Sequence, residues 1–288
     1  MLYNDEIKDC ISNSIQGFNS CIILCGPNNA GKSYTLRGEE HHEGILGKSV
    51  KDLFSLMEIS QQVNTGNTVK SLYGLKMSIY TVFNECIYDL VKKNSSTPLQ
   101  ISKFIDKDTG TYFTKINDLS EAEIKNYNEY NNLVNHSLQH RKILETTLKV
   151  NDFKKKSNLI VSFILSKKEI SAESNSTTFE KSQNIAQIDF VELTSTDYGL
   201  DLNTDKSDYF GKTTATNFRS IKNNLESLAV RKKPRYESNL TLALKRTLNP
   251  TSQIVFINCV HSNEEPPTES YKALKVKNFI LLYTLLFI

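Results

Sequence analysis

The sequence predicts an α/β fold in which a central, largely parallel β-sheet is flanked by helices. Two observations carry this prediction. Apolar runs of strand length alternate with helix-periodic segments along most of the 288 residues, an order that packs helices on both faces of a parallel sheet. In addition, the glycine-rich segment Gly26–Ser33 lies between an apolar run and a helical segment, where such loops bind phosphate groups.

The first part of the chain supplies a helix, a buried strand and two further helices. Residues 4–17 place three isoleucines four residues apart and end at a glycine, which predicts an amphipathic helix. Cys21–Cys25 is apolar throughout, as expected of a strand buried on both faces. A helix is expected to begin at Tyr34, and the spacing of apolar residues in 44–60 predicts another.

The remainder of the chain continues the alternation with one small insertion. Residues 75–83 predict a half-buried strand, and residues 99–116 predict a β-hairpin that turns at 108–110. The elements expected next are a helix over 120–138, a strand over 159–165, a polar loop over 170–183, a strand over 185–191, a polar loop over 194–210, helices over 212–230 and 238–248, a strand over 253–260 and a helix after Pro267. Without repeats or sustained heptads, residues 1–288 are expected to form a single domain.

The composition excludes several classes of protein. Hydrophobic residues make up 39% and charged residues 23% of the chain, as in soluble globular proteins, and the net charge of +3 by itself indicates no particular partner. Five cysteines without a CxxC pair argue against a disulfide scaffold or a zinc site and favour a reduced, cytoplasmic protein. The N-terminus has no secretory signal pattern.

The C-terminal run Phe279–Ile288 is strongly apolar. It has about half of the roughly 20 residues that a membrane-spanning helix requires. We therefore expect a terminal helix that packs on the core, and no membrane partner. Insertion of this tail into a membrane is the alternative.

The loop Gly26–Ser33, GPNNAGKS, matches the phosphate-binding pattern G-x-x-x-x-G-K-[ST] at every position. In this pattern backbone N–H groups surround a phosphate, the lysine reaches the β- and γ-phosphates, and the hydroxyl coordinates Mg²⁺. Lys32 and Ser33 fill these positions, which predicts ATP and Mg²⁺ as cofactors. The candidate nucleotide-binding residues are Gly26, Pro27, Asn28, Asn29, Ala30, Gly31, Lys32, Ser33 and Tyr34.

Segments on both sides of this loop resemble the kinesin motor domain family. Residues 17–38, GFNSCIILCGPNNAGKSYTLRG, are similar to the family signature GYNxTIxAYGQTxxGKTYTMxG. Weaker matches follow in the family's order at 44–46, 79–90 and 99–101, and PRYESNLT at 234–241 is similar to the family's PYRDSKLT. The resemblance covers nearly the whole chain and implies the fold of a P-loop NTPase.

The resemblance implies a motor head that binds ATP, Mg²⁺ and microtubules and couples ATP hydrolysis to microtubule-based movement, as part of the cytoskeleton. The family's opening strand and its stalk have no counterpart in this sequence. Two alternatives stay open. One is a nucleotide- and microtubule-binding head without turnover, and the other is an unrelated P-loop kinase or NTPase. No nucleic acid partner is expected, because no basic groove interleaved with aromatic residues is apparent.

The family's first switch motif, NxxSSRSH, falls on Asn151–Asn158, NDFKKKSN. In motors the paired serines help to hold Mg²⁺ and the attacking water. Lys154 and Lys155 replace them, and an ammonium group cannot ligate a hard cation as a hydroxyl does. Lys156 keeps the charge of the family's arginine without its bidentate geometry. Because phosphoryl transfer depends on positioned charge, these changes argue against rapid hydrolysis.

The second switch motif, DLAGSE, falls on Asp189–Thr194. Asp189 then matches the aspartate that contacts Mg²⁺ through water. Glu192 replaces the glycine that approaches the γ-phosphate, which adds bulk and negative charge, and it is also the candidate for a replacement catalytic base. Thr194 replaces the glutamate that pairs with the arginine of the first switch.

Positive charge gathers between residues 219 and 246 in what is the candidate microtubule-binding surface. In motor heads this helix–loop–helix region faces the acidic microtubule, and clustered cations attract such a partner in a salt-dependent way. A solvated helix face explains the charge equally well, whereas the match at 234–241 favours the microtubule. The candidate residues are Lys222, Arg231, Lys232, Lys233, Arg235, Lys245 and Arg246.

Overall fold

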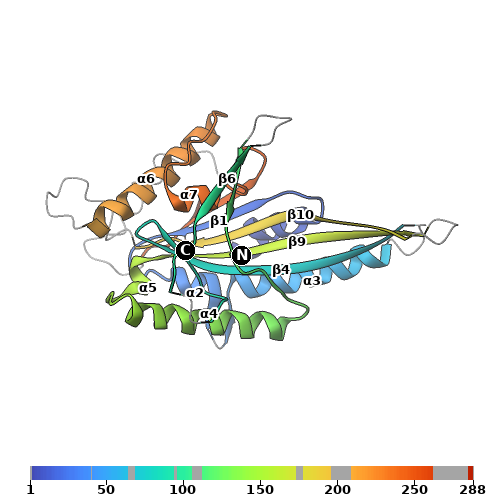
Figure 1. The fold of residues 1–288 in the computed structure, drawn as a ribbon, viewed down its shortest axis with the longest axis horizontal. Helices are drawn as coiled ribbons and strands as arrows, with labels where there is room; N and C mark the ends of the chain where they lie inside the picture. Colours follow the sequence, from blue (N-terminus) through green and yellow to red (C-terminus); the bar gives the residue numbers. More distant parts are fainter. Residues whose placement is uncertain are drawn as a thin grey trace.

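The structure, a computed structural model, contains a long twisted β-sheet that runs across the molecule with helices on both faces (Figure 1). Three expectations from the sequence fall largely or wholly outside the described residues: the turn at 108–110, most of the loop over 194–210 and the helix after Pro267. The structure describes residues 2–39, 41–63, 69–93, 96–105, 112–172, 178–195, 209–261 and 285–287.

Four parallel strands form one half of the sheet. β1 (Ser20–Cys25) lies between β11 (Gln253–Asn258) and β10 (Thr178–Glu192), and β12 (Leu285–Phe287) pairs with β11 at the edge. This arrangement places the carboxyl end of β1, and therefore the glycine-rich loop, beside the carboxyl ends of two parallel neighbours. Ligands bind at such edges in open α/β sheets.

The other half of the sheet is antiparallel. β9 (Asn158–Ala172) pairs with β10 and with β4 (Val69–Phe83), and β4 also pairs with β5 (Cys86–Asp89) and β8 (Ala122–Glu123). The β4–β5 hairpin turns on Asn84 and Glu85, which both have positive φ, as two-residue hairpin loops require. The predicted α/β class is confirmed, and the sheet is mixed, with its parallel strands gathered around β1.

Helices cover the two faces of the sheet unequally (Figure 1). One face is covered by the N-terminal helices and by the helices before β4 and β9, and the other face by two helices near the C-terminus and a hairpin. The first group is η1 (Tyr3–Ile7), α1 (Lys8–Ser14), α2 (Lys32–Arg37), α3 (Ile45–Val63), α4 (Tyr127–Thr147) and α5 (Phe153–Lys156). The second is α6 (Tyr209–Ala229), α7 (Asn239–Ala243) and the hairpin of β6 (Ile101–Ile105) and β7 (Tyr112–Ile116). The short strands β2 (Gly38–Glu39) and β3 (His42–Glu43) pair after α2.

The side chains of β1 alternate between two hydrophobic cores. Ile22 and Leu24 pack in the core beneath α1–α5, whereas Cys21, Ile23 and Cys25 pack in the core beneath α6 and α7. All five are fully buried, as predicted for a strand covered on both faces. Because each buried aliphatic side chain contributes roughly 1.5–3 kcal/mol, β1 is a rigid base for the loop that follows it.

Two predicted elements differ from the structure. The polar loop predicted over 170–183 is wrong for the described residues 170–172 and 178–183, since β9 and β10 continue through them and Ala172 pairs with Thr178. The helix predicted over 120–138 begins later, because Asn126 is its N-cap and accepts a hydrogen bond from the Glu129 amide at 2.9 Å. In both cases backbone pairing or capping decided the structure, and the apolar pattern carried no signal for it.

The apolar C-terminal run also differs from its prediction in the part that is described. Residues 285–287 form strand β12, which pairs with β11, where a helix was predicted. Within the described segments, none of the helices has the length and apolar character needed to cross a bilayer. A run of about ten apolar residues fits a buried strand as well as a helix, so its period alone does not decide between them.

A buried polar cluster around Asp189 joins β9, β10 and the turn after α7. The Asp189 carboxylate accepts hydrogen bonds from the Ser162 hydroxyl at 2.5 Å, from the Thr247 hydroxyl at 2.5 Å and from Gln187 Nε2 at 3.0 Å. Burial raises the pKa of Asp189, and the three donors act against that rise. The cluster therefore attaches the turn at Thr247 to the centre of the sheet.

Replacement of Asp189 with alanine leaves the donors of Ser162, Thr247 and Gln187 without their acceptor inside the protein. We expect Asp189→Ala to lower the free energy of unfolding by about 2–3 kcal/mol, because each buried polar group left unsatisfied is costly. Urea denaturation followed by circular dichroism measures the change. Glu58→Ala, at an exposed position of α3, is the control and is expected to change stability by less than about 0.5 kcal/mol. A similarly small loss for Asp189→Ala would contradict the structural assignment.

Candidate functional site

The glycine-rich loop takes the backbone conformation that its sequence requires. Gly26 has φ +145°, and a Cβ atom there would lie 2.2 Å from the carbonyl oxygen of Cys259, so the loop approaches the end of β11 too closely for a side chain. Gly31 has φ +88° and precedes α2. The two glycines therefore allow a sharp turn from β1 into α2 that other residues would strain.

Lys32 is turned back into this loop. Its ammonium group donates hydrogen bonds to the carbonyl oxygens of Gly26 and Pro27, both at 2.7 Å, and the residue is 8% exposed. The side chain is thus held over the turn, where its charge is available to an anion that the loop surrounds.

Ser33 and Glu192 meet at the start of α2. The Ser33 hydroxyl donates a hydrogen bond to Glu192 Oε1, and Glu192 is the last residue of β10. The contact follows from the sheet, because Glu192 is opposite Leu24 in the parallel register of β1 and β10. Two oxygen-bearing side chains, 159 residues apart in sequence, therefore lie side by side at the loop.

Asp189, the residue matched to the metal-contacting aspartate, lies elsewhere. It is opposite Cys21, near the start of β1, and its carboxylate belongs to the buried cluster with Ser162 and Thr247. Asp189 and Glu192 are three positions apart, which corresponds to about 10 Å along a strand and to opposite faces of the sheet. The structure therefore brings Glu192, and not Asp189, to the phosphate loop, which corrects the placement expected from the sequence.

Arg141 of α4 fixes the segment that carries the first switch motif. It is 4% exposed, and its guanidinium donates to the carbonyl oxygens of Lys154 and Ser157 at 3.1 and 2.7 Å and to the Ser157 hydroxyl at 2.8 Å. Burial lowers the pKa of Arg141 to about 10, while the nearby Glu192 carboxylate opposes that change. No pattern in the sequence points to this residue, because a single arginine within a polar helix usually faces solvent.

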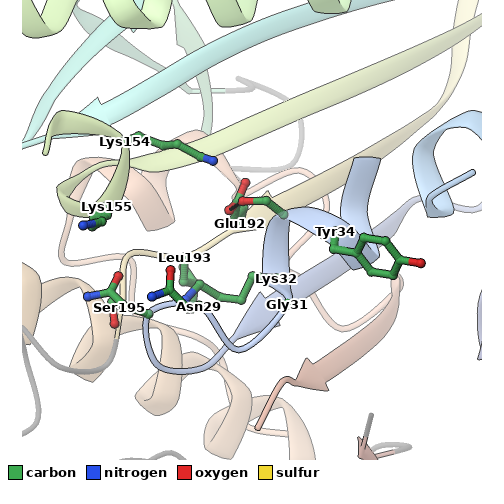
Figure 2. A pocket seen from close by; sticks show the side chains of 11 residues that line it. Asn29, Gly31, Lys32, Tyr34, Lys154, Lys155, Glu192, Leu193 and Ser195 are labelled. Atoms are coloured by element: carbon green, nitrogen blue, oxygen red, sulfur yellow. Dashed lines mark hydrogen bonds between the residues drawn. The ribbon is translucent and has the colours of Figure 1, made fainter. Parts of the chain in front are cut away.

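A cleft of about 330 Å³ opens between the glycine-rich loop, α5 and the end of β10. Figure 2 shows Lys154 extending toward Glu192 from one side of the cleft and Lys32 lying below them. The structure thus joins three segments that the sequence identified separately. The lining residues are Asn28, Asn29, Gly31, Lys32, Ser33, Tyr34, Lys154, Lys155, Glu192, Leu193 and Ser195.

Tyr34 points away from this cleft (Figure 2). Its ring meets His42 edge to face, with 6.3 Å between centroids, and the residue is 45% exposed. It also lines a second cleft, of about 410 Å³, beside the N-terminus and α3. Tyr34 therefore lies at the boundary of the two clefts and lines both, with its ring directed away from the first.

The basic residues predicted to bind a partner do not all have the same exposure. Lys222 lies 3.6 Å from Glu226 within α6, and Lys245 donates to the carbonyl oxygen of Tyr112 in β7. Burial, with help from Lys233 and Lys103, lowers the pKa of Lys245 to about 8. Lys245 therefore attaches the turn after α7 to the hairpin. The exposed members are Arg231, Lys232, Lys233, Arg235 and Arg246.

Comparison with known proteins identifies the family. The sequence model of the kinesin motor domain family matches residues 1–278 of this chain. The chain is 26% identical over 194 residues to kinesin-like protein KIF1A of Rattus norvegicus, and 23% identical over 279 residues to Kinesin-related protein 1 of Dictyostelium discoideum. These alignments cover 67% and 95% of this chain but only 10% and 12% of the two relatives.

The fold comparison agrees with the sequence comparison. A solved structure described as "Crystal structures of mutants reveal a signalling pathway for activation of the kinesin motor ATPase" matches with a TM-score of 0.72 at 15% identity. The match covers 97% of this chain and 78% of that one. The resemblance noted in the sequence is confirmed, and the chain belongs to the kinesin motor domain family.

Proposed function

We propose that this chain is a motor head that binds Mg²⁺ and ATP, binds microtubules, and couples ATP hydrolysis to microtubule-based movement in the cytoskeleton. The observation that carries the proposal is the contact between Ser33 and Glu192 at a complete phosphate-binding loop. Ser33 follows the lysine of that loop, and a carboxylate beside this hydroxyl is the pair that P-loop NTPases use at their metal.

The residues at this contact suit Mg²⁺. A hydroxyl and a carboxylate are the hard oxygen ligands that Mg²⁺ prefers. Glu192 Oε2 is buried and, among the described residues, has no hydrogen-bond partner, so an oxygen is available for a cation or its water. We therefore assign the metal to Ser33 and Glu192, where it neutralises phosphate charge. In this assignment Glu192 takes the place of Asp189, and it acts as a metal ligand in place of a catalytic base.

This assignment moves the second switch motif by three residues. If Glu192 corresponds to the aspartate of DLAGSE, then Ser195 corresponds to its glycine and Asp197 to its glutamate. Asp197 lies outside the described residues. Ser195 lines the cleft, as expected of a residue that approaches the phosphates. In this alignment Glu192 stands at the motif's aspartate, and Asp197, an acid in place of Thr194, stands at its glutamate.

The two adjoining clefts divide the nucleotide between them. The cleft at Lys32 and Ser33 receives the phosphates, because it contains the loop and its lysine. The second cleft receives the nucleoside, with Tyr34 at the boundary between the two. An aromatic ring that is 45% exposed offers a base a stacking surface.

A second candidate function is a head that binds nucleotide and microtubules without turnover. The observation in its favour is the presence of Lys154 and Lys155 on α5, at the cleft, where the family has hydroxyl groups. Neither lysine can hold an attacking water against a metal ion as a serine does. Steady-state ATP hydrolysis in the presence of microtubules separates the two candidates.

Lys32→Ala removes the cation of the phosphate loop. We expect the affinity for a fluorescent ATP analogue to fall by about 100-fold, because a lysine that bonds phosphate oxygens in a partly buried loop contributes a charge-assisted interaction. Fluorescence anisotropy titration measures the affinity. Lys8→Ala, an exposed lysine on α1, is the control and is expected to bind as the wild type does. Unchanged binding by Lys32→Ala would remove the nucleotide from this loop.

The exposed basic residues between α6 and α7 are proposed to bind the microtubule. We expect the triple variant Arg231→Ala, Lys232→Ala, Lys233→Ala to pellet with microtubules about tenfold more weakly, because loss of clustered charge weakens an electrostatic interface. Binding by the wild type is expected to fall as salt increases. Co-sedimentation over a series of salt concentrations measures both changes in microtubule binding. ATPase assays on the same samples measure turnover.

The matched control removes three exposed lysines from other parts of the head, in the variant Lys8→Ala, Lys125→Ala, Lys142→Ala. It has the same change in net charge and is expected to pellet as the wild type does. Turnover stimulated by microtubules supports the motor, and pelleting without turnover supports the second candidate. Absence of pelleting by the wild type at every salt concentration contradicts both.

A further inference from the structure

α5 is a short helix that is held firmly against the core. Phe153 at its start is fully buried and packs on Phe83, with 5.1 Å between ring centroids. At the other end of the helix, Arg141 donates hydrogen bonds to the carbonyl oxygen of Lys154 at 3.1 Å and to that of Ser157, the residue that follows the helix, at 2.7 Å. The backbone that carries the lysines is therefore fixed from both ends, although the side chains of Lys154 and Lys155 are exposed.

Two neighbouring lysines of α5 point in different directions. Lys154 extends into the cleft toward the Glu192 carboxylate (Figure 2). Lys155 lies at the edge of the cleft, and its ammonium group turns away from Glu192 to pair with Asp152 at 3.0 Å. A lysine run on a solvated surface has no reason to aim one member at a buried carboxylate. The direction of Lys154 into the cleft therefore indicates a role at the site.

Lys154 lies among other cations. Partial burial lowers its pKa first, and the positive charges of Arg37 and Arg141 lower it further, whereas Glu192 acts in the opposite direction. With Lys32 on the opposite wall, the cleft has more positive than negative side chains around Glu192. Such a site is stabilised by an anion that enters it, and the phosphate loop defines where an anion goes.

The chemistry of lysine differs from that of the hydroxyl group expected at this position. A hydroxyl contacts phosphate through the metal ion that it ligates, whereas an ammonium group repels a cation and donates hydrogen bonds to phosphate oxygens directly. A carboxylate such as Glu192 also repels phosphate unless a cation lies between them. Lys154 is a cation that belongs to the protein and is directed at that carboxylate.

We propose that Lys154 contacts the terminal phosphate of the bound nucleotide and takes over part of the charge neutralisation by Mg²⁺, so that this head binds nucleotide with only a weak dependence on Mg²⁺. The inference rests on the nucleotide site proposed above. It assigns to α5 a binding contact in place of the metal-holding contact that serines make. Nucleotide affinity with and without the metal is thus the relevant quantity, independent of turnover.

The experiment compares the affinity for a fluorescent ATP analogue in Mg²⁺ with that in EDTA, for the wild type, Lys154→Ser and Lys154→Arg. For the wild type we expect EDTA to weaken binding by less than about threefold. For Lys154→Ser we expect a loss of about tenfold or more in EDTA and smaller changes in Mg²⁺, because the metal again becomes the main neutralising cation. Lys154→Arg keeps the charge and is expected to resemble the wild type.

Lys142→Ser removes an exposed lysine from the adjacent helix α4 and controls for the loss of one charge near the site. It is expected to keep the wild-type ratio of the two affinities. The inference is overturned if the wild type binds nucleotide only with Mg²⁺, or if Lys154→Ser keeps the wild-type ratio. A wild-type head that binds nucleotide in neither condition overturns the proposed nucleotide site as well, so the two failures are distinguishable.

Discussion

The parallel register of β1 and β10 is the constraint on which the site depends. It places Glu192 opposite Leu24, one residue before the end of β1, so that the carboxylate meets the helix that the glycine-rich loop starts. The fully buried side chains of β1 hold this register, because a slip of one residue would turn each of them to the wrong face. The hydrogen bond between Ser33 and Glu192 therefore depends on the packing of the β1 side chains in the core, because that packing sets the register of β1 and β10.

The same constraint explains which parts of the site could be predicted. The loop Gly26–Ser33 is contiguous, and its pattern and flanking apolar strand were sufficient to locate it. The acid partner is on a distant strand, and the similarity of one aspartate to a motif selected Asp189. Side chains three positions apart face opposite sides of a strand, so a shift of three residues exchanged the proposed metal ligand, Glu192, for a residue of the buried cluster. The alternation of side chains along the strand shows that Asp189 and Glu192 lie on opposite faces of the sheet. Only the pairing of β10 with β1 shows which of the two lies beside the phosphate loop.

Other features depended on interactions that leave no trace in the order of residues. Arg141 holds α5 through backbone carbonyl groups, which every sequence contains. The extension of β9 and β10 runs through polar residues because β4, β9 and β10 pair there and satisfy one another's backbone groups. The fold class, by contrast, followed from buried apolar runs and their alternation. The mixed sheet shows the limit of that reasoning, since the alternation does not fix strand direction.

The measurement that tests the central claim most directly is electron paramagnetic resonance of Mn²⁺, used in place of Mg²⁺, bound together with nucleotide. The account predicts that Glu192→Gln weakens Mn²⁺ binding by about tenfold or more, since loss of a metal-holding group typically costs that much. Asp189→Asn, which keeps the shape of the buried cluster, is predicted to leave the Mn²⁺ affinity and spectrum unchanged in the folded protein. Loss of Mn²⁺ in Asp189→Asn together with normal binding in Glu192→Gln would contradict the account.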